Sequence, residues 1–141
     1  MYGDRPRAKE VIMTEYIRED DIADRLLINR VTDQEIADAN EYVDRIAAAY
    51  NVKKVTVTPM AKKLAVAVAS RDCCLNLIGT DASAMIGDRQ EDAYSIKYKI
   101  YASLVEDLRG RILKADFLAD EEKDDEEERG AWTRAVSISR S

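Results

Sequence analysis

The chain has 141 residues, of which 46% are hydrophobic and 35% are charged, a composition typical of a folded domain rather than a disordered chain. Its formal charge of −6 comes largely from residues 119–141, whose eight acids and four bases leave only −2 for residues 1–118. Neither a membrane span of roughly 18 apolar residues nor a signal-peptide pattern is present, and two adjacent cysteines make no disulfide framework, so we expect an intracellular protein without membrane contact.

The first 31 residues predict an arm followed by a short helix. Residues 1–13 are rich in charge and poor in apolar side chains, which indicates an N-terminal arm. In the stretch YIREDDIADRLLINRV, Asp20 is suited to cap a helix, and Ile22 and Leu26 form an apolar pair at i, i+4 spacing. We therefore expect a short helix after Asp20.

The strongest helical pattern follows in VTDQEIADANEYVDRIAAAYNV. Thr32 and Glu35 have the spacing of a capping box, in which each side chain binds the other residue's backbone N–H. Apolar side chains then recur every three to four residues, at Ile36, Ala39, Val43, Ile46, Ala47 and Tyr50. This periodicity predicts an amphipathic helix with one face in the core.

A second helix is expected from Pro59 to Ile78. The preceding VKKVTVTP alternates like a short strand that Pro59 ends, and Thr58 followed by Pro59 is a typical helix start. One apolar stripe comprises Leu64, Val68, Leu75 and Ile78, and another comprises Val66, Cys73 and Leu77. A helix buried on two faces lies at the centre of a bundle, and Gly79 is suited to end it.

A loop at TDASAMIGD leads to the last predicted helix. Asp88 and Glu91 form a second capping signal. Apolar residues continue in helical steps at Ala93, Ile96, Ile100, Tyr101, Leu104, Leu108 and Ile112. If the helix runs to about residue 118, its ~30 residues span ~45 Å, so that part of it is solvated or contacts another chain. Gly110 favours a kink or an early end.

Side chains suited to catalysis or metal binding are scarce. The chain has no histidine, which removes the commonest general base and zinc ligand, and its five glycines form no phosphate-binding loop. Asp81 and Asp88 lack the alternating acidic ligands of a calcium loop. No basic stripe follows the sequence, which disfavours sequence-specific nucleic-acid binding. We expect a protein that is not an enzyme, with no catalytic, cofactor-binding or metal-binding residues.

Two sets of residues have alternative interpretations. Cys73 and Cys74 are adjacent and suit a redox pair or a metal corner, but consecutive helical residues point about 100° apart, which favours simple packing of reduced thiols. Tyr94, Tyr98 and Tyr101 form a stripe beside the apolar face of the last helix. They are either the edge of the core or a subunit interface, where tyrosine is enriched.

The C-terminal segment combines two opposite charge patterns. Residues 119–128 hold eight carboxylates, whose mutual repulsion favours an extended, solvated linker. Beyond Gly130, arginines mix with apolar residues in a pattern typical of a docking peptide, whose partner-binding residues would be Trp132, Arg134, Val136 and Ile138. The alternatives are a frayed tail and a tryptophan that folds back on its own domain.

These elements predict an all-α fold. It comprises a small helical bundle with a long C-terminal helix, residues 14–118, between an extended N-terminal arm, residues 1–13, and a C-terminal arm, residues 119–141, formed by the acidic linker and docking tail.

The order of the elements resembles that of the head–tail connector (adaptor) proteins of tailed bacteriophages. The resemblance covers residues 14–113 and rests on the succession of YIREDDIADRL, TDQEIADANEYVDRIAAAYNV, a VTP junction, MAKKLAVAVASRDCCLNL and DAYSIKYKIYASLVEDLRGRI. In that family a helix, a long helix, a proline junction, a core helix and a terminal helix occur in this order and at this size.

The resemblance implies a structural subunit, not an enzyme, that assembles in the bacterial host cytoplasm and lies at the head–tail junction of the virion. Such subunits form a homo-oligomeric ring, typically of twelve copies, beneath the portal protein, and they pass DNA toward the tail or stopper protein without sequence-specific binding. They commonly reach the portal or a neighbouring subunit through a C-terminal extension.

The leading alternative is a small helical regulatory or chaperone-like protein that binds a partner through its C-terminal tail. A minimal enzyme or a helix-turn-helix DNA-binding protein forms a third class, which the missing histidine and basic face disfavour.

Overall fold

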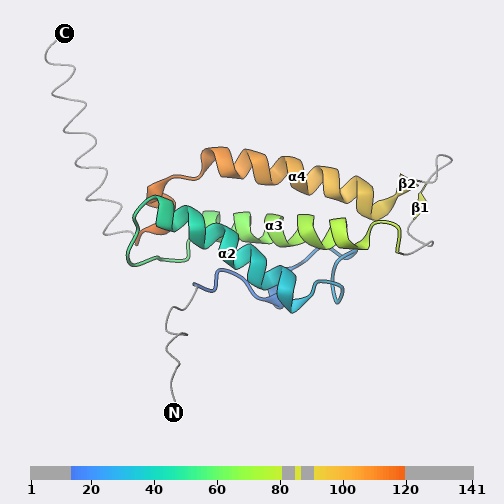
Figure 1. Ribbon diagram of the computed structural model, residues 1–141, viewed down its shortest axis with the longest axis horizontal. Helices are drawn as coiled ribbons and strands as arrows, with labels where there is room; N and C mark the ends of the chain where they lie inside the picture. The colour runs from blue at the N-terminus through green and yellow to red at the C-terminus, as the bar shows by residue number, and fades with distance from the viewer. Residues whose placement is uncertain (1–13, 81–84, 87–90, 120–141) are drawn as a thin grey trace, which may run out of the picture.

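The computed structural model of the chain describes residues 14–80, 85–86 and 91–119 (Figure 1). In these residues the fold is mostly helical, which confirms the predicted all-α class; the N-terminal arm and residues 120–141 lie outside the described ranges. The α-helices are α2 (Asp33–Ala49), α3 (Pro59–Leu77) and α4 (Ala93–Arg111), and the shorter elements are the 3-10 turns η1 (Glu19–Asp21) and η3 (Lys114–Phe117) and the strands β1 (Met85–Ile86) and β2 (Glu91–Asp92).

Helix α3 is the centre of the fold, as its two apolar stripes predicted. Figure 1 shows α4 on one side of α3 and α2 on the other. Its buried residues point in several directions around the helix: Ala61, Leu64, Ala65, Ala67, Val68, Ala69, Ser70, Cys73 and Cys74. The first predicted stripe is not buried at its C-terminal end, where Leu75 is 53% exposed and Ile78 is 38% exposed. Opposite this end, α2 is only beginning, since the amide of Asn76 donates to Glu35 in the first turn of α2 at 2.6 Å.

Local capping signals set where the helices start. Thr32 and Glu35 form the predicted capping box, with reciprocal bonds of 2.9 and 3.2 Å between side chain and backbone. Thr58 caps α3, and Pro59 occupies its first turn as expected. The side-chain oxygens replace water as partners of N–H groups that the first helical turn leaves unpaired.

The start of α4 differs from the prediction at Asp88, because the capping residue is Asp92. Its carboxylate accepts bonds from the backbone N–H of Tyr94 at 2.7 Å and of Gly79 at 2.6 Å. Gly79 has a φ of 79°, the left-handed conformation expected of a residue that ends a helix. One carboxylate thus joins the end of α3 to the start of α4. Asp88 itself lies outside the described residues, and the predicted loop contains the antiparallel pair β1–β2.

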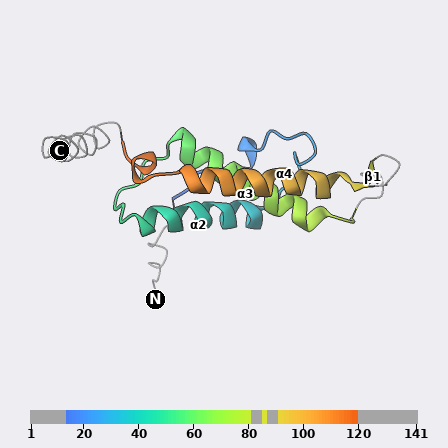
Figure 2. The same cartoon turned by 90° about the horizontal axis from the view of Figure 1, so that it is seen from above.

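Residues 14–31, here the N-terminal strap, do not form the predicted helix after Asp20. They contain η1 and irregular turns, and η1 lies on the opposite side of α3 from α2 (Figure 2). Local bonds explain the difference, because the Asp24 carboxylate accepts the N–H of Leu26 at 2.9 Å and so competes with helical hydrogen bonding. The strap instead buries apolar side chains at irregular spacing: Tyr16, Ile17, Ile22, Leu27 and Val31.

A buried asparagine and a partly buried carboxylate attach the strap to the helices. On α2, the side-chain oxygen of Asn40 accepts the N–H groups of Tyr16 and Ile17, both at 3.0 Å, and its amide donates to the carbonyl of Ile17 at 3.2 Å. On α4, Tyr101 donates its hydroxyl to Asp24, and Lys97 lies 3.1 Å from the same carboxylate. The strap is therefore tied to both helices that flank α3.

The last helix is shorter than predicted. Helix α4 has 19 residues and ends at Arg111, one residue after Gly110, so it spans ~28 Å and not the expected ~45 Å. Tertiary contacts explain the early end, since the Tyr50 hydroxyl donates to the carbonyl of Ile112 at 3.0 Å and the chain then turns to bury Phe117 against the Tyr50 ring. The predicted strand before α3 is absent from residues 51–58, where Thr56 makes a single bond to the Phe117 carbonyl at 2.9 Å.

The difference between Leu64 and Leu75 gives a test of the packing. Leu64 is fully buried, so Leu64→Ala should lower the free energy of unfolding by about 2–5 kcal/mol, through lost burial and a new cavity. Leu75→Ala removes the same atoms from an exposed site and should change it by less than about 0.5 kcal/mol. Urea melts followed by circular dichroism measure both values, and equal losses would contradict this placement of α3.

A second test concerns the Asp24 carboxylate, which is 10% exposed. Burial alone would raise the pKa of Asp24, but the hydrogen bonds from Tyr101 and Leu26 and the charge of Lys97 outweigh it, so the pKa lies below its ordinary 3.8. Asp24→Asn should therefore cost about 2 kcal/mol at neutral pH, because charge-assisted hydrogen bonds are lost. Lys97→Met should cost less, since Lys97 is 41% exposed.

The pH dependence follows from the lowered pKa of Asp24. A carboxyl with a depressed pKa in the folded state stabilises the fold above its unfolded pKa, and this contribution disappears as the pH falls through the folded pKa. The difference between the wild-type chain and Asp24→Asn should therefore be constant near neutrality and shrink below pH 3.8. Urea melts of both chains near neutral pH and below pH 3.8 measure this difference in stability. A difference independent of pH would show that Asp24 does not act through its charge.

Candidate interaction groove

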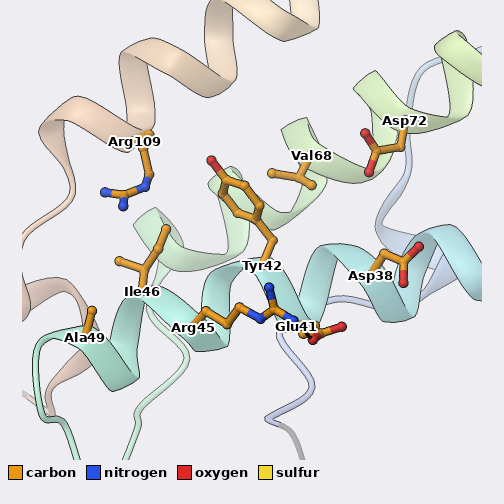
Figure 3. Close-up of a pocket in the computed structure, with 9 residues that line it drawn as sticks. All are labelled: Asp38, Glu41, Tyr42, Arg45, Ile46, Ala49, Val68, Asp72 and Arg109. Carbon is orange, nitrogen blue, oxygen red and sulfur yellow. Dashed lines mark hydrogen bonds and ion pairs between the residues drawn. The ribbon is translucent and has the colours of Figure 1, made fainter.

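A groove runs between α2 and α4, with α3 as its floor (Figure 3). The groove forms because α2 and α4 each pack against α3 and are separated from each other by it. Its volume is about 460 Å³. The residues that line it are Asp38, Glu41, Tyr42, Arg45, Ile46 and Ala49 from α2, Val68 and Asp72 from α3, and Arg109 from α4.

The middle of the groove is apolar and aromatic. Ile46 and Val68 are buried below it, and the ring of Tyr42 is half-buried between α2 and α3 in Figure 3. The guanidinium of Arg71 lies 5.7 Å from the centre of the Tyr42 ring, within the range of a cation–π contact. Arg71 also lies 3.0 Å from the carboxylate of Asp72, so the Tyr42 ring is fixed against α3 by a paired cation.

Charges of opposite sign occupy the two ends of the groove. Figure 3 shows Asp38 and Asp72 toward one end and Arg109 toward the other, where α2 finishes at Ala49. Asp38 accepts a bond from Gln34 at 2.8 Å, and Glu41 is ion-paired with Arg45 one turn along α2. Arg109 is exposed and makes no ion pair or hydrogen bond with any described residue. The groove thus has an acidic end and a basic end.

The basic end of the groove continues into a basic end of the whole bundle. Residues 45–63 hold five bases and no acid, and residues 104–119 hold three bases and three acids, so these segments together carry +5. They lie side by side, because Tyr50 bonds to Ile112 and Thr56 to Phe117. The exposed bases here are Arg45, Lys53, Lys54, Lys62, Lys63, Arg109 and Arg111. The sequence shows no continuous basic stripe, and it therefore did not predict this basic cluster. The cluster forms only where the two segments meet in the fold.

These side chains suit binding of a polypeptide. An apolar centre, an aromatic ring and separated charges of both signs can receive a segment with apolar and charged residues in matching order. In the described ranges, no three histidine, cysteine or carboxylate side chains are placed to hold a metal ion together. Over the same part of the chain, no helix is long and apolar enough to cross a membrane.

Comparisons of this chain with protein-family models, curated proteins and solved structures find no match.

The three tyrosines of the predicted stripe have different environments. Tyr94 is 1% exposed, so in this fold it belongs to the core and is not available as a subunit interface. Tyr101 is half-buried, and its hydroxyl is bonded to Asp24. Tyr98 is half-buried and packs against the core cluster. The core-edge interpretation therefore describes Tyr94 and Tyr101, and part of the Tyr98 side chain is exposed.

The structure describes the residues of the groove but not those of the predicted docking tail. Trp132, Arg134, Val136 and Ile138 lie outside the described residues. Sequence patterns did not indicate the groove, because Arg45 and Arg109 belong to the polar faces of two helices and become neighbours only through packing on α3. The only local signal was helical spacing within α2, where the lining residues Asp38, Glu41, Tyr42, Arg45, Ile46 and Ala49 follow one another at three- to four-residue steps.

The two cysteines are buried free thiols in α3, and neither is exposed at all. Burial raises the pKa of Cys73 and of Cys74 to about 12, and the nearby Glu35 carboxylate contributes at Cys73. The thiolate is the nucleophilic form of cysteine, so both groups should be unreactive at neutral pH.

Reaction with iodoacetamide tests this environment of the cysteines. In the folded chain at neutral pH we expect no modification of Cys73 or Cys74, whereas the chain unfolded in urea should add two groups. Intact-mass spectrometry counts the additions over time. Modification of either thiol in the folded chain at the rate seen in urea would contradict its burial in α3.

Proposed function

We propose that the chain is a structural head–tail adaptor of a tailed bacteriophage. The observation that carries the proposal is the fixed point from which residues 120–141 leave the helical body. An adaptor must hold its own body rigid while it reaches a second protein, and this chain has a C-terminal segment with a predicted tryptophan anchor attached to a firmly packed end. The succession of α2, α3 and α4 also agrees with the long, core and terminal helices of the connector family that the sequence resembles, whereas the first short helix of that family is replaced here by the N-terminal strap.

The attachment point is held by several contacts. Phe117 is fully buried, with its ring centre 6.2 Å from that of Tyr50. The carbonyl of Phe117 accepts the N–H of Thr56 at 2.9 Å, and the hydroxyl of Thr58 bonds to the carbonyl of Asp116. Because two successive residues of η3 are tied to the connection between α2 and α3, force on the C-terminal segment is transmitted to the bundle core.

In this function the partners are the portal protein, neighbouring adaptor subunits in a ring of twelve copies, as is typical of the connector family, and a tail or stopper protein, at the head–tail junction of the virion. DNA passes through the ring without sequence-specific binding. Helix α2 is suited to face that channel, since it carries five acids and one base. A surface of this sign repels phosphates and does not hold DNA in place. The basic end of the bundle would then face other subunits.

A small helical regulatory or chaperone-like protein is the second candidate. The groove favours it, because a mixed-charge groove also suits a monomer that captures one partner peptide. A regulator binds its partner with fixed small stoichiometry, whereas an adaptor forms a ring on the portal. The two functions therefore differ in the mass of the complex.

The test is a search for a portal gene beside this gene, followed by assembly of the chain with the portal protein that it encodes. We expect a complex with the mass of a portal ring plus a ring of adaptors by native mass spectrometry and electron microscopy. Deletion of residues 130–141 should abolish the complex, and Trp132→Ala should weaken it, while the circular dichroism spectrum of each variant keeps its helical signal. A genome without portal, capsid or tail genes nearby, or full assembly of the deletion variant, would overturn the proposal.

A further inference from the structure

We propose that the groove between α2 and α4 binds the chain's own residues 120–141 in the unassembled protein. The inference names the site on this chain that its C-terminal segment occupies before a partner is met. It rests on four observations: where the segment leaves the bundle, the order of its charges, its length, and two side chains exposed at the far end of the groove.

The segment leaves the bundle at the basic end of the groove. Its first residue follows Ala119, two residues after Phe117, whose carbonyl is bonded to Thr56 in the connection between α2 and α3. The same end of the groove is lined by Ala49, at the end of α2, and by Arg109, near the end of α4. Residue 120 therefore starts beside the groove, and the tether gives the segment a high effective concentration there.

The charges of the segment are opposite in sign, in the same order along the chain, to the charges that it would meet in the groove. Residues 120–128 carry eight acids and one base, and residues 129–141 carry three arginines and no acid. Leaving from the basic end, the acidic part first meets Arg109, Lys53 and Lys54, none of which has a partner among the described residues. The basic part then meets the acidic end of the groove. This alignment places opposite charges together at the two ends of the groove, and the reverse alignment would place like charges together there.

The length of the acidic part matches the length of the groove. From Ala49 back to Asp38, α2 advances ~17 Å at its rise of about 1.5 Å per residue. The nine residues from Asp120 to Glu128 cover ~15 Å at half of full extension. Arg129 and Arg134, on either side of Trp132, would then lie near the carboxylates of Asp38 and Asp72.

Two side chains that the fold leaves partly exposed lie at this acidic end. Leu75 is three residues beyond Asp72 and seven beyond Val68, which puts it within about 20° of Val68 around the helix, and it is 53% exposed. On α4, Tyr98 is eleven residues before Arg109, or about 20° from it around the axis. The ends of α3 and α4 meet at Asp92, so Tyr98 and Leu75 both belong to the end away from Arg109. They supply the apolar surface that Trp132 requires.

The arrangement gives the C-terminal segment a held state and a released state. In the held state Trp132 is shielded from solvent, and a partner with a better site for it displaces the segment from the groove. The inference concerns the isolated chain, so its failure leaves the proposed adaptor function intact, and a failure of portal assembly leaves the inference intact.

Fluorescence of Trp132, the only tryptophan, tests the proposal on the full chain. At low salt we expect its emission to lie at shorter wavelength, and to be quenched less by acrylamide, than that of a synthetic peptide of residues 120–141. Added sodium chloride should shift the emission toward that of the peptide, because screening weakens the charge pairs. Emission identical to the free peptide at low salt would overturn the proposal.

Charge reversal locates the site. Arg109→Glu should shift the emission toward that of the free peptide, and reversing the linker in the same chain with Asp124→Lys and Asp125→Lys should restore part of the shift. Lys63→Glu is the matched control, since Lys63 is an exposed base at the same end of the bundle but about 140° from Val68 around α3, and it should have a much smaller effect than Arg109→Glu. Circular dichroism confirms that each variant is folded. Equal effects of the Arg109 and Lys63 reversals would place the segment elsewhere.

Dilution distinguishes the chain's own segment from that of a second copy. Intramolecular binding is independent of protein concentration, so the emission should stay constant through a dilution series and the chain should remain a monomer in sedimentation. Emission that moves toward the free peptide on dilution would show exchange between copies and would refute binding within one chain.

Discussion

Packing on the central helix α3 is the constraint on which the rest of the structure depends. Small side chains surround this helix at Ala61, Ala65, Ala67, Ala69, Ser70, Cys73 and Cys74, all of them buried. Such side chains let neighbouring segments approach the α3 backbone closely on more than one side. Helix α2 and helix α4 use two sides, and the N-terminal strap uses a third, through contacts such as the ion pair of Asp21 with Lys62 at 3.2 Å. The groove is what remains along the fourth side.

The N-terminal strap covers part of this core, and the side chains of Asn40 and Asp24 hold it in place. The strap has no regular hydrogen-bond ladder, so its position depends on a few side chains that replace one. Asn40 satisfies three backbone groups of the strap, and Asp24 links it to α4. Each anchor is buried or nearly so, where a lost hydrogen bond leaves an unpaired group and therefore costs more than the same loss at the surface.

Much of the local structure could be predicted from the sequence, because short-range signals determine it. The Thr32–Glu35 capping box, the Thr58–Pro59 start and the end at Gly79 depend on residues within a few positions of each other, and the structure confirms them. Two of the errors fall where distant residues decide the outcome. The end of α4 depends on Tyr50, some sixty positions earlier, and the exposure of Leu75 depends on where α2 begins.

The groove shows the same limit more strongly. Its charges come from three helices, and the composition of the chain gives no indication that bases from residues 45–63 and 104–119 meet at one end. Periodicity places Arg109 correctly on a polar face of α4, but periodicity does not show which face of another helix it will meet. Sites formed by packing are therefore the part of this molecule that needed coordinates.

The Asp92 carboxylate accepts two hydrogen bonds, one from Gly79 at the end of α3 and one from Tyr94 at the start of α4. This arrangement also affects which sequence changes the chain can tolerate. It closes the connection between these helices at its base, so the helices are held at a fixed separation whatever number of residues lies between Gly79 and Asp92. The entropy of closing a longer connection grows only slowly with its length. Insertions there would leave the helical register untouched, which makes this hairpin a natural place for evolutionary diversification and for grafting a foreign epitope.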